Sequence, residues 1–201
     1  MAGVVVLILH PEPGRGAGTL ERWVADARRE LAEAHRAAFA AAGAVDVRVV
    51  GGPPDDTPFG ARLRSFVETE RPSGLVVLGS GSIPLATPAD RGAFFAAASS
   101  GRADVLTNNR FSADIVAVGD AGVLLGLPDL ASDNALPRWL AEVAGCQVSE
   151  RRSVRLEIDI DGPLDLLLVG GQRSKGVAPP AVIRVAAVLA ARNCNRRVCM
   201  P

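Results

Sequence analysis

Three short segments rich in apolar residues, each followed by a longer segment of helical composition, constrain the fold of this chain most strongly. Residues 3–10 and 75–78 are continuously apolar, 45–50 alternates between apolar and polar residues, and helices are expected over 20–42, 60–70 and 88–98. A continuous apolar strand is typical of a parallel sheet, because helices cover both faces of such a sheet. Alternation of these strands with helices is the pattern of right-handed βαβ units. The sequence therefore predicts a three-layer α/β fold, with a mostly parallel, twisted sheet between helices on both faces.

Cap residues indicate where two of these helices begin and where one ends. Thr19 is a candidate N-cap for the helix over 20–42, and Gly43 is expected to end that helix. Thr87 followed by Pro88 is the pattern of an N-cap with proline at the first helical position. These local signals define the connections between the first strands and their helices.

The second half of the chain is less regular. Strands are expected at 105–106, 115–118, around 148 and over 154–160, with helices over 135–143 and 164–169. Such irregularity is expected where a mixed sheet carries the second half of a site. The sequence thus predicts that the sheet is not parallel throughout.

The length of 201 residues suits one compact domain with an appended element. We expect the α/β domain to cover 1–169. The remaining part, 170–201, is expected to form a linker over 170–180, a helix over 181–192 and a terminal tail.

Charge and composition narrow the class of partner. The net charge is zero, so no basic field indicates binding to nucleic acid or to an anionic membrane. No apolar run has the length of a membrane helix, and three cysteines give no disulfide framework. We expect a cytoplasmic protein, for which a monomer and a homodimer are both open. Lys175 is the only lysine, so a positive charge that neutralises phosphate must come from this residue or from arginine.

A loop rich in small residues follows the third apolar segment. It contains Gly79, Ser80, Gly81, Ser82 and Pro84. Small residues allow a ligand to approach the backbone, and ligands of α/β proteins bind at the carboxyl ends of strands. The NH groups and the two hydroxyls of this loop are suited to a phosphate, a ribose or a sugar. The alternative interpretation is a tight connection from strand to helix with no ligand.

Two acidic residues lie at the end of the strand expected over 154–160, Asp159 within it and Asp161 directly after it. Strand alternation places Asp159 and Asp161 on the same face, where two carboxylates could hold Mg²⁺ or Mn²⁺ against a triphosphate. Their mutual repulsion favours a cation or a group of donors between them. In the alternative interpretation, Asp161 caps the helix that starts at Pro163, and Asp159 pairs with an arginine.

A polar loop over 107–114 supplies a further set of candidates. Asn108 and Asn109 carry donors and acceptors suited to a base or a sugar, and Arg110 could bind a phosphate. Asp114 could act as a metal ligand if the loop folds back toward the sheet. The alternative is a turn in which these side chains bond their own backbone.

A second polar cluster, Ser132-Asp133-Asn134, raises the expectation that two loops share one pocket. Its alternative role is a helix cap before Pro137.

The loop after the first apolar segment contains Gly14, Arg15 and Gly16. Glycines before a helix can cradle an anion, and Arg15 is a candidate phosphate ligand. This is not a P-loop, because no Gly-Lys-Ser/Thr follows, and a plain flexible loop is the alternative. Of the two histidines, His10 is expected to be a satisfied residue at a strand end, and His35 is expected on the solvent face of its helix.

Two of these stretches resemble the nucleotidyltransferases related to molybdenum-cofactor guanylyltransferase and phospholactate guanylyltransferase. Their Gly-Asp-x-Pro-Leu loop and following Thr-Pro are matched by Ile83-Pro84-Leu85 and Thr87-Pro88. Their Asp-x-Asp-Thr-Pro-x-Asp-Leu stretch is matched over 159–166, with Gly162 in place of threonine. The chain departs from the family at Gly81 or Ser82, where the family has a metal-binding aspartate. Gly14-Arg15-Gly16 is a loose match to the family's first glycine-rich loop.

This resemblance implies a nucleotide-diphospho-sugar transferase-like fold. It also implies transfer of a nucleoside monophosphate from an NTP (GTP or CTP) to a small phosphorylated acceptor, with Mg²⁺ or Mn²⁺. Asp159, Asp161 and Asp114 would hold the metal, and Arg15 or Arg110 the phosphates. A protein that keeps the fold but only binds a nucleotide or sugar is an alternative, because the loop aspartate is absent. A glycosyltransferase of related fold is another.

Overall fold

The computed structural model describes residues 3–52 and 55–171. The helix predicted over 181–192 and the tail after it lie outside the described residues. So does the linker predicted over 170–180, apart from its first two residues, which belong to the last described helix.

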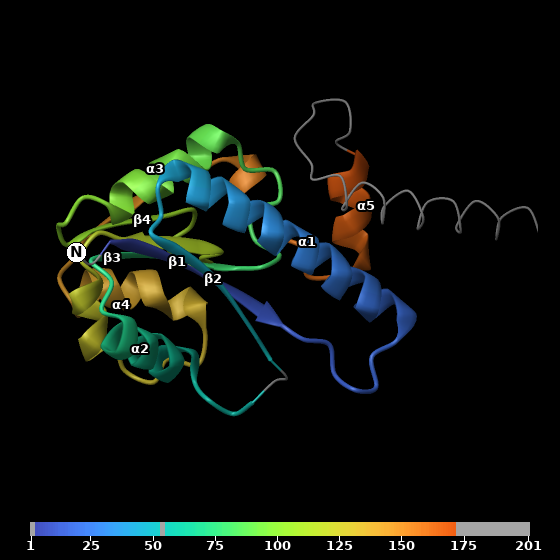
Figure 1. The fold of residues 1–201 in the computed structure, drawn as a ribbon, viewed down its shortest axis with the longest axis horizontal. Helices are drawn as coiled ribbons and strands as arrows, with labels where there is room; N and C mark the ends of the chain where they lie inside the picture. The colour runs from blue at the N-terminus through green and yellow to red at the C-terminus, as the bar shows by residue number, and fades with distance from the viewer. Residues whose placement is uncertain (1–2, 53–54, 172–201) are drawn as a thin grey trace, which may run out of the picture.

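The described residues form one six-stranded mixed sheet with helices on both faces (Figure 1). Its strands are β1 (Val4–Pro11), β2 (Asp46–Gly52), β3 (Gly74–Gly79), β4 (Asp104–Thr107), β5 (Ile115–Val118) and β6 (Gln147–Glu150). They lie in the order β2-β1-β3-β5-β4-β6, and β5 runs antiparallel to both of its neighbours. The other pairs are parallel. The predicted three-layer α/β fold is therefore confirmed.

Five α-helices are described: α1 (Thr19–Ala42), α2 (Phe59–Glu70), α3 (Pro88–Ala98), α4 (Leu136–Glu142) and α5 (Pro163–Gly171). Short 3₁₀ turns cover Ala121–Gly126, Asp133–Ala135 and Val154–Leu156. Helices α1 and α3 cover one face of the sheet, and α2 and α4 cover the other (Figure 1). No helix in the described part of the chain is both long and apolar enough to cross a membrane.

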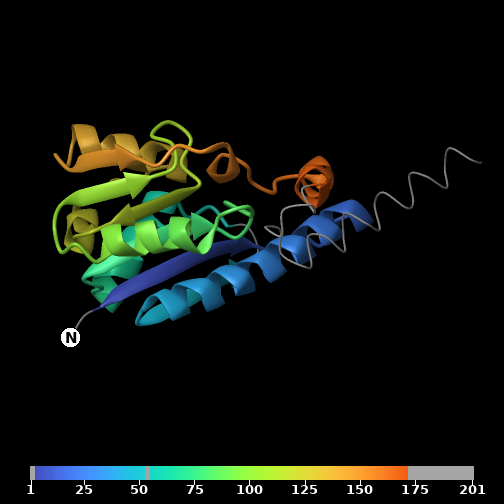
Figure 2. The ribbon, with the colours of Figure 1, turned by 90° about the horizontal axis from the view of Figure 1, so that it is seen from above.

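Alternation along β1 separates two apolar cores. Val6 and Ile8 pack on the side of α1 and α3, whereas Val5 and Leu7 pack on the side of α2. The first half of α1 extends past the carboxyl ends of the strands, and α5 lies beside it (Figure 2). A third, smaller core joins these two helices and includes Ile160. This extension of α1 places one face of the helix at the edge of the sheet where the loops after the strands lie.

The predicted caps are present with one shift. Gly43 ends α1 in the left-handed region, with φ of 109°. Thr87 caps α3, and its side chain accepts a hydrogen bond from the NH of Asp90. At the start of α1, however, Gly18 rather than Thr19 is the N-cap, and its NH donates to Glu21 Oε2 at 2.6 Å. The acidic side chain in the first turn therefore satisfies the NH of the N-cap residue, as the N3 glutamate of a capping box does.

The strand predicted over 154–160 is wrong. Its first three residues form a 3₁₀ turn, and only Asp159 makes an isolated antiparallel bridge, with Ser82. After β6, which is the last strand of the sheet, the chain leaves the sheet and runs toward α1. Leu156 and Ile160 therefore enter two different cores instead of one face of a strand.

Candidate active site

Four carboxylates and one guanidinium group surround a cavity of about 260 Å³ beside the glycine-rich loop. The carboxylates come from three separate stretches of chain: Asp114 before β5, Asp133 in a 3₁₀ turn, and the pair Asp159 and Asp161 before α5. Gly79, Gly81, Ser82, Ser112, Ala113 and Asn134 complete the lining. The two polar loops thus share one pocket with the acidic segment, as the sequence analysis expected.

Burial and mutual repulsion raise the pKa values of three of these acids. The pKa of Asp159 is raised to about 6, first by burial and then by the adjacent Asp161 carboxyl. Burial also raises the pKa of Asp114 and of Asp133, and the charge of Asp161 contributes to both shifts. The cavity therefore concentrates negative charge that a bound cation would relieve.

Arg28 is the cation of this site, and the sequence analysis missed it. Its Nη2 donates to Asp161 Oδ1 at 2.6 Å, and its Nε is buried with no hydrogen-bond partner among the described residues. The arginine lies one helical turn after Val24 and three residues before Leu31, both of which are buried. A charged residue within this apolar row of α1 was the sequence signal that could have identified Arg28, because a charge among buried residues needs a specific partner.

Gly81 allows Arg28 to lie against the loop. A Cβ atom at this position would lie 2.6 Å from the carbonyl oxygen of Ile160 and 2.8 Å from Arg28 Nε. Neither distance is compatible with a side chain. Glycine is therefore required at position 81 for steric reasons, because only glycine leaves room for both Ile160 and Arg28.

A second cavity, of about 520 Å³, lies on the other side of Arg28 and Asp161. It is lined by the loop after β1, which includes Gly14 and Gly16, and by the start of α1. Arg28 and Asp161 line both cavities and so form their common wall. Arg15 is exposed and lines neither cavity of this pair.

Several other residues singled out in the sequence line neither of these two cavities. Ser80 is buried and hydrogen-bonded to His10 Nδ1 at 3.0 Å, and Pro84 is buried without lining either cavity. The pKa of His10 is lowered by burial and by two nearby arginines. His10 is thus buried at a strand end, as expected, but only its Nδ1 is satisfied, because its Nε2 has no partner in the described part of the chain.

The asparagines of the polar loop bond their own neighbourhood. Asn108 is buried, donates to Asp114 Oδ2 at 2.7 Å and to the carbonyl of Leu156 at 2.8 Å, and accepts from two backbone NH groups. Asn109 Oδ1 accepts from the NH groups of the two turn residues that follow Arg110. Arg110 lines neither cavity, and its NH donates to a glutamate of β6. Of this loop's candidates, Asp114 is the one whose carboxylate lines the site.

The alternative roles considered for the acidic pair are not the ones that the structure shows. Asp161, and not Asp159, pairs with an arginine. Asp165 accepts hydrogen bonds from the NH groups of Asp161 and Gly162 at the start of α5, at 3.0 and 2.7 Å. Asp161 is therefore left to face the cavities.

The prediction that His35 faces solvent is wrong. His35 is fully buried beneath the glycine-rich loop, where its Nε2 lies 2.9 Å from the carbonyl oxygen of Ser82. His35 is buried by a tertiary contact, because α3 and the glycine-rich loop pack over this face of α1.

The mixed sheet with its flanking helices is the nucleotide-diphospho-sugar transferase-like fold of known nucleotidyltransferases. A nucleotidyl transferase from Methanothermobacter thermautotrophicus matches with a TM-score of 0.59 at 17% identity, over 83% of this chain and 95% of its own. A cytidylyltransferase from Leptospira borgpetersenii matches with a TM-score of 0.55 at 13% identity, over 96% and 94%. A CMP:2-keto-3-deoxy-manno-octonic acid synthetase in complex with CTP gives 0.51 at 13% identity, over 87% and 100%. At such identities the likeness establishes the fold, which confirms the family fold expected from the two motifs.

No protein-family model matches this chain, and no curated protein matches it in sequence.

Proposed function

We propose that this protein transfers a nucleoside monophosphate from GTP or CTP to a small phosphorylated acceptor. In this reaction an acceptor phosphate oxygen attacks the α-phosphorus, the bond between the α-phosphorus and the bridging oxygen breaks, and pyrophosphate leaves. The observation that carries the proposal is the pair of adjoining cavities at the carboxyl edge of the sheet, with Arg28 and Asp161 as their common wall. Two substrates in these two cavities would meet at a cation and a carboxylate, which is the chemistry that phosphoryl transfer needs.

The residues of the acidic cavity fit Mg²⁺ or Mn²⁺. Carboxylate oxygens suit these hard cations, and the raised pKa of Asp159 reports a negative charge that lacks compensation. In the described part of the chain, no group of three or more His, Cys, Asp or Glu side chains is arranged to hold a metal ion. Asp159 and Asp161 would therefore hold the cation together with substrate phosphates, as is usual for Mg²⁺. The bound cation would neutralise charge on the triphosphate.

The protein's own groups supply positioning and charge. Arg28 would bind phosphate oxygens through its planar guanidinium, because this residue lines both cavities and its Nη2 already bonds Asp161 there. The backbone of Gly79, Gly81 and Ser82 would contact the nucleotide or the acceptor. Asp114 and Asp133 would keep the cavity anionic and selective for a cation.

Thermal unfolding with each NTP and with nucleotide-sugars, in the presence and absence of Mg²⁺ or Mn²⁺, tests this proposal. A ligand that binds the native state raises the melting temperature by mass action. We expect a metal-dependent shift with one NTP that is lost in Asp159→Asn. Asp129→Asn is the matched control, because Asp129 pairs with Arg64 and lines neither cavity. Release of pyrophosphate in the presence of phosphorylated acceptors then identifies the second substrate.

A binding protein that keeps the fold without catalysis is the second candidate. The absence of a carboxylate at Gly81 and Ser82, and the existing ion pair of Asp161 with Arg28, favour it. Its signature would be a nucleotide or sugar shift that needs no metal and survives Asp159→Asn. No shift with any nucleotide would refute the transferase.

A further inference from the structure

The glycine-rich loop contains a backbone conformation that its sequence does not favour. Ile83 is in the left-handed region with φ of 44°, which is a genuine outlier for a β-branched residue. Its side chain is completely buried in the core beneath α1 and α3. The residue before it, Ser82, lines the acidic cavity and bridges to Asp159. A strained residue therefore lies directly behind the backbone that forms the site, and the surrounding structure must hold it there.

Two buried polar side chains bond the loop on either side of Ile83. Arg91 Nε donates to His35 Nδ1 at 3.2 Å, so Nδ1 is the acceptor of the imidazole and Nε2 carries the proton. His35 Nε2 therefore donates to the carbonyl oxygen of Ser82 at 2.9 Å. Arg91 Nη1 donates to the carbonyl oxygen of Ala86 at 2.7 Å. Both loop carbonyls thus take their hydrogen bonds from this histidine–arginine pair.

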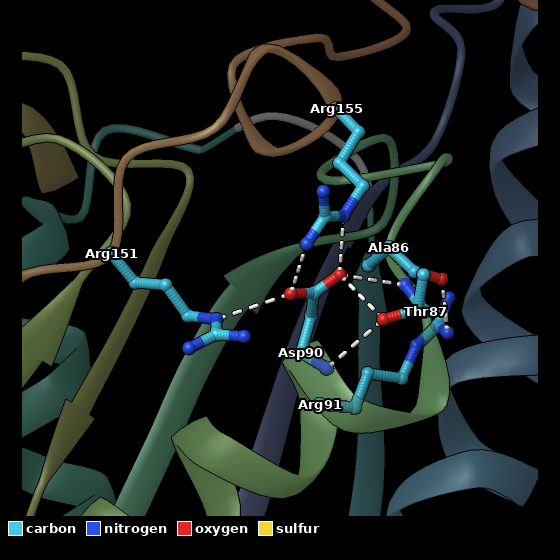
Figure 3. A network of polar contacts seen from close by, with 6 residues as sticks. All are labelled: Ala86, Thr87, Asp90, Arg91, Arg151 and Arg155. Atoms are coloured by element: carbon cyan, nitrogen blue, oxygen red, sulfur yellow. Dashed lines mark hydrogen bonds and ion pairs between the residues drawn. The ribbon is translucent and has the colours of Figure 1, made fainter.

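The same network reaches the acidic segment through the residue next to Arg91. Figure 3 shows the fully buried Asp90 carboxylate between Thr87 and the guanidinium groups of Arg151 and Arg155. Arg155 bonds it through Nε and Nη2, at 2.7 and 2.9 Å, and Arg151 through Nε at 3.1 Å. These two arginines belong to the stretch that leads from β6 to Asp159. Neighbouring residues of α3 therefore hold both halves of the site.

We propose that His35 and Arg91 are positioning residues that hold the backbone of Ser82 and Ile83 in the conformation that binds substrate. The functional part of this inference rests on the proposed nucleotidyl transfer, but the conformational part does not. One backbone bridge extends the effect to the acidic side: Ser82 and Asp159 lie opposite each other in it, and Ile160 NH donates to the carbonyl of Gly81 at 3.0 Å. Burial and the charge of Arg91 lower the pKa of His35 to about 3, so the imidazole remains a neutral donor near neutral pH.

Three variants, with a fourth in reserve, separate positioning from general stability. His35→Leu removes both hydrogen bonds, whereas His35→Gln retains an amide NH that can donate to Ser82. Phe39→Leu is the matched control, because Phe39 is buried on the same helix with its ring centroid 6.5 Å from the imidazole. Arg91→Lys serves if His35→Leu does not fold, since lysine keeps the charge but lacks the planar fork that bonds two acceptors.

The first readout is hydrogen exchange without ligand, followed in peptides covering 79–87 and 157–161. At conditions of equal global stability, we expect exchange in both peptides to be at least about tenfold faster in His35→Leu than in Phe39→Leu. His35→Gln should restore most of the protection. Equal exchange in His35→Leu and Phe39→Leu would overturn the proposal.

The second readout is binding of Mn²⁺ with the NTP that shifts the wild-type protein. If the loop adopts its binding conformation only a tenth of the time, the apparent affinity falls about tenfold. We expect that loss in His35→Leu and not in Phe39→Leu, and unchanged affinity in both would overturn the positioning role. If the wild-type protein binds no NTP, the proposed function fails, and the exchange comparison alone decides whether His35 and Arg91 position the loop.

Discussion

Gly81→Ala is the substitution whose effect the structure defines most sharply. The new Cβ would lie 2.6 Å from the carbonyl oxygen of Ile160, which is backbone and cannot move alone, and 2.8 Å from Arg28 Nε. Forcing a methyl group into such a site costs about 1–3 kcal/mol. The hydrogen bond from Ile160 NH to the carbonyl of Gly81 would be displaced as well, at about 1 kcal/mol.

We therefore expect Gly81→Ala to lower the free energy of unfolding by about 2–4 kcal/mol. For a domain of this size each kcal/mol shifts the melting temperature by about 2–4 °C, so the expected decrease is roughly 4–16 °C. Calorimetry or thermal circular dichroism measures it. Movement of Arg28 away from Asp161 should also abolish any metal-dependent NTP shift.

Gly92→Ala is the internal control. Gly92 lies within α3, and a Cβ there would meet nothing within 4 Å. Alanine is favoured over glycine inside a helix by about 0.5–1 kcal/mol, so this variant should melt higher than the wild type. The same chemical change thus has opposite signs at two positions. If Gly81→Ala melts at or above the wild-type temperature, the close approach of Ile160 and Arg28 to the loop is refuted.

Three further predictions concern buried charge. The folded pKa of His35, about 3, lies below its unfolded value of 6.5, so protonation favours the unfolded chain and stability is lost as the pH falls below 6.5. Linkage gives a decrease of about 2 kcal/mol in the free energy of unfolding between pH 7 and pH 5. Urea unfolding at the two pH values should show a smaller decrease in His35→Gln. The folded pKa of Asp159 is raised from 3.8 to about 6, so stability falls as the pH rises from 3.8 to about 6 and stays lower above it. Without metal at pH 7, Asp159→Asn should therefore be more stable than the wild type by about 1 kcal/mol after allowance for screening, and the gain should vanish at pH 4. Asp90→Asn should cost about 1.5–3 kcal/mol in chemical denaturation, because it removes the charge that Arg151 and Arg155 share, whereas Asp129→Asn should cost less than 1 kcal/mol.

The sequence alone was sufficient for most of the strand and helix pattern, apart from the strand expected over 154–160, and for several residues that share one cavity. Continuous apolar runs and cap residues such as Thr87 and Gly43 act over a few positions, so their signal is local and survives without tertiary information. The two motif stretches were also placed at one edge of the sheet, because polar segments that follow neighbouring strands meet there. Gly81, Asp114 and Asp159 were all candidates from the sequence and do line one cavity, although Asp159 does not end a strand.

The tertiary structure decided which side chains complete that cavity. Arg28 meets Asp161 across 133 positions of sequence, and His35 meets Ser82 across 47. Both contacts exist because α1 packs over the ends of the strands. No local sequence pattern shows which helix will cover which loop. The stretch over 154–160 alternates like a strand but has no neighbouring strand to pair with beyond Ser82. Periodicity reports the preference of a segment, whereas its final conformation and its partners depend on what the rest of the chain places beside it.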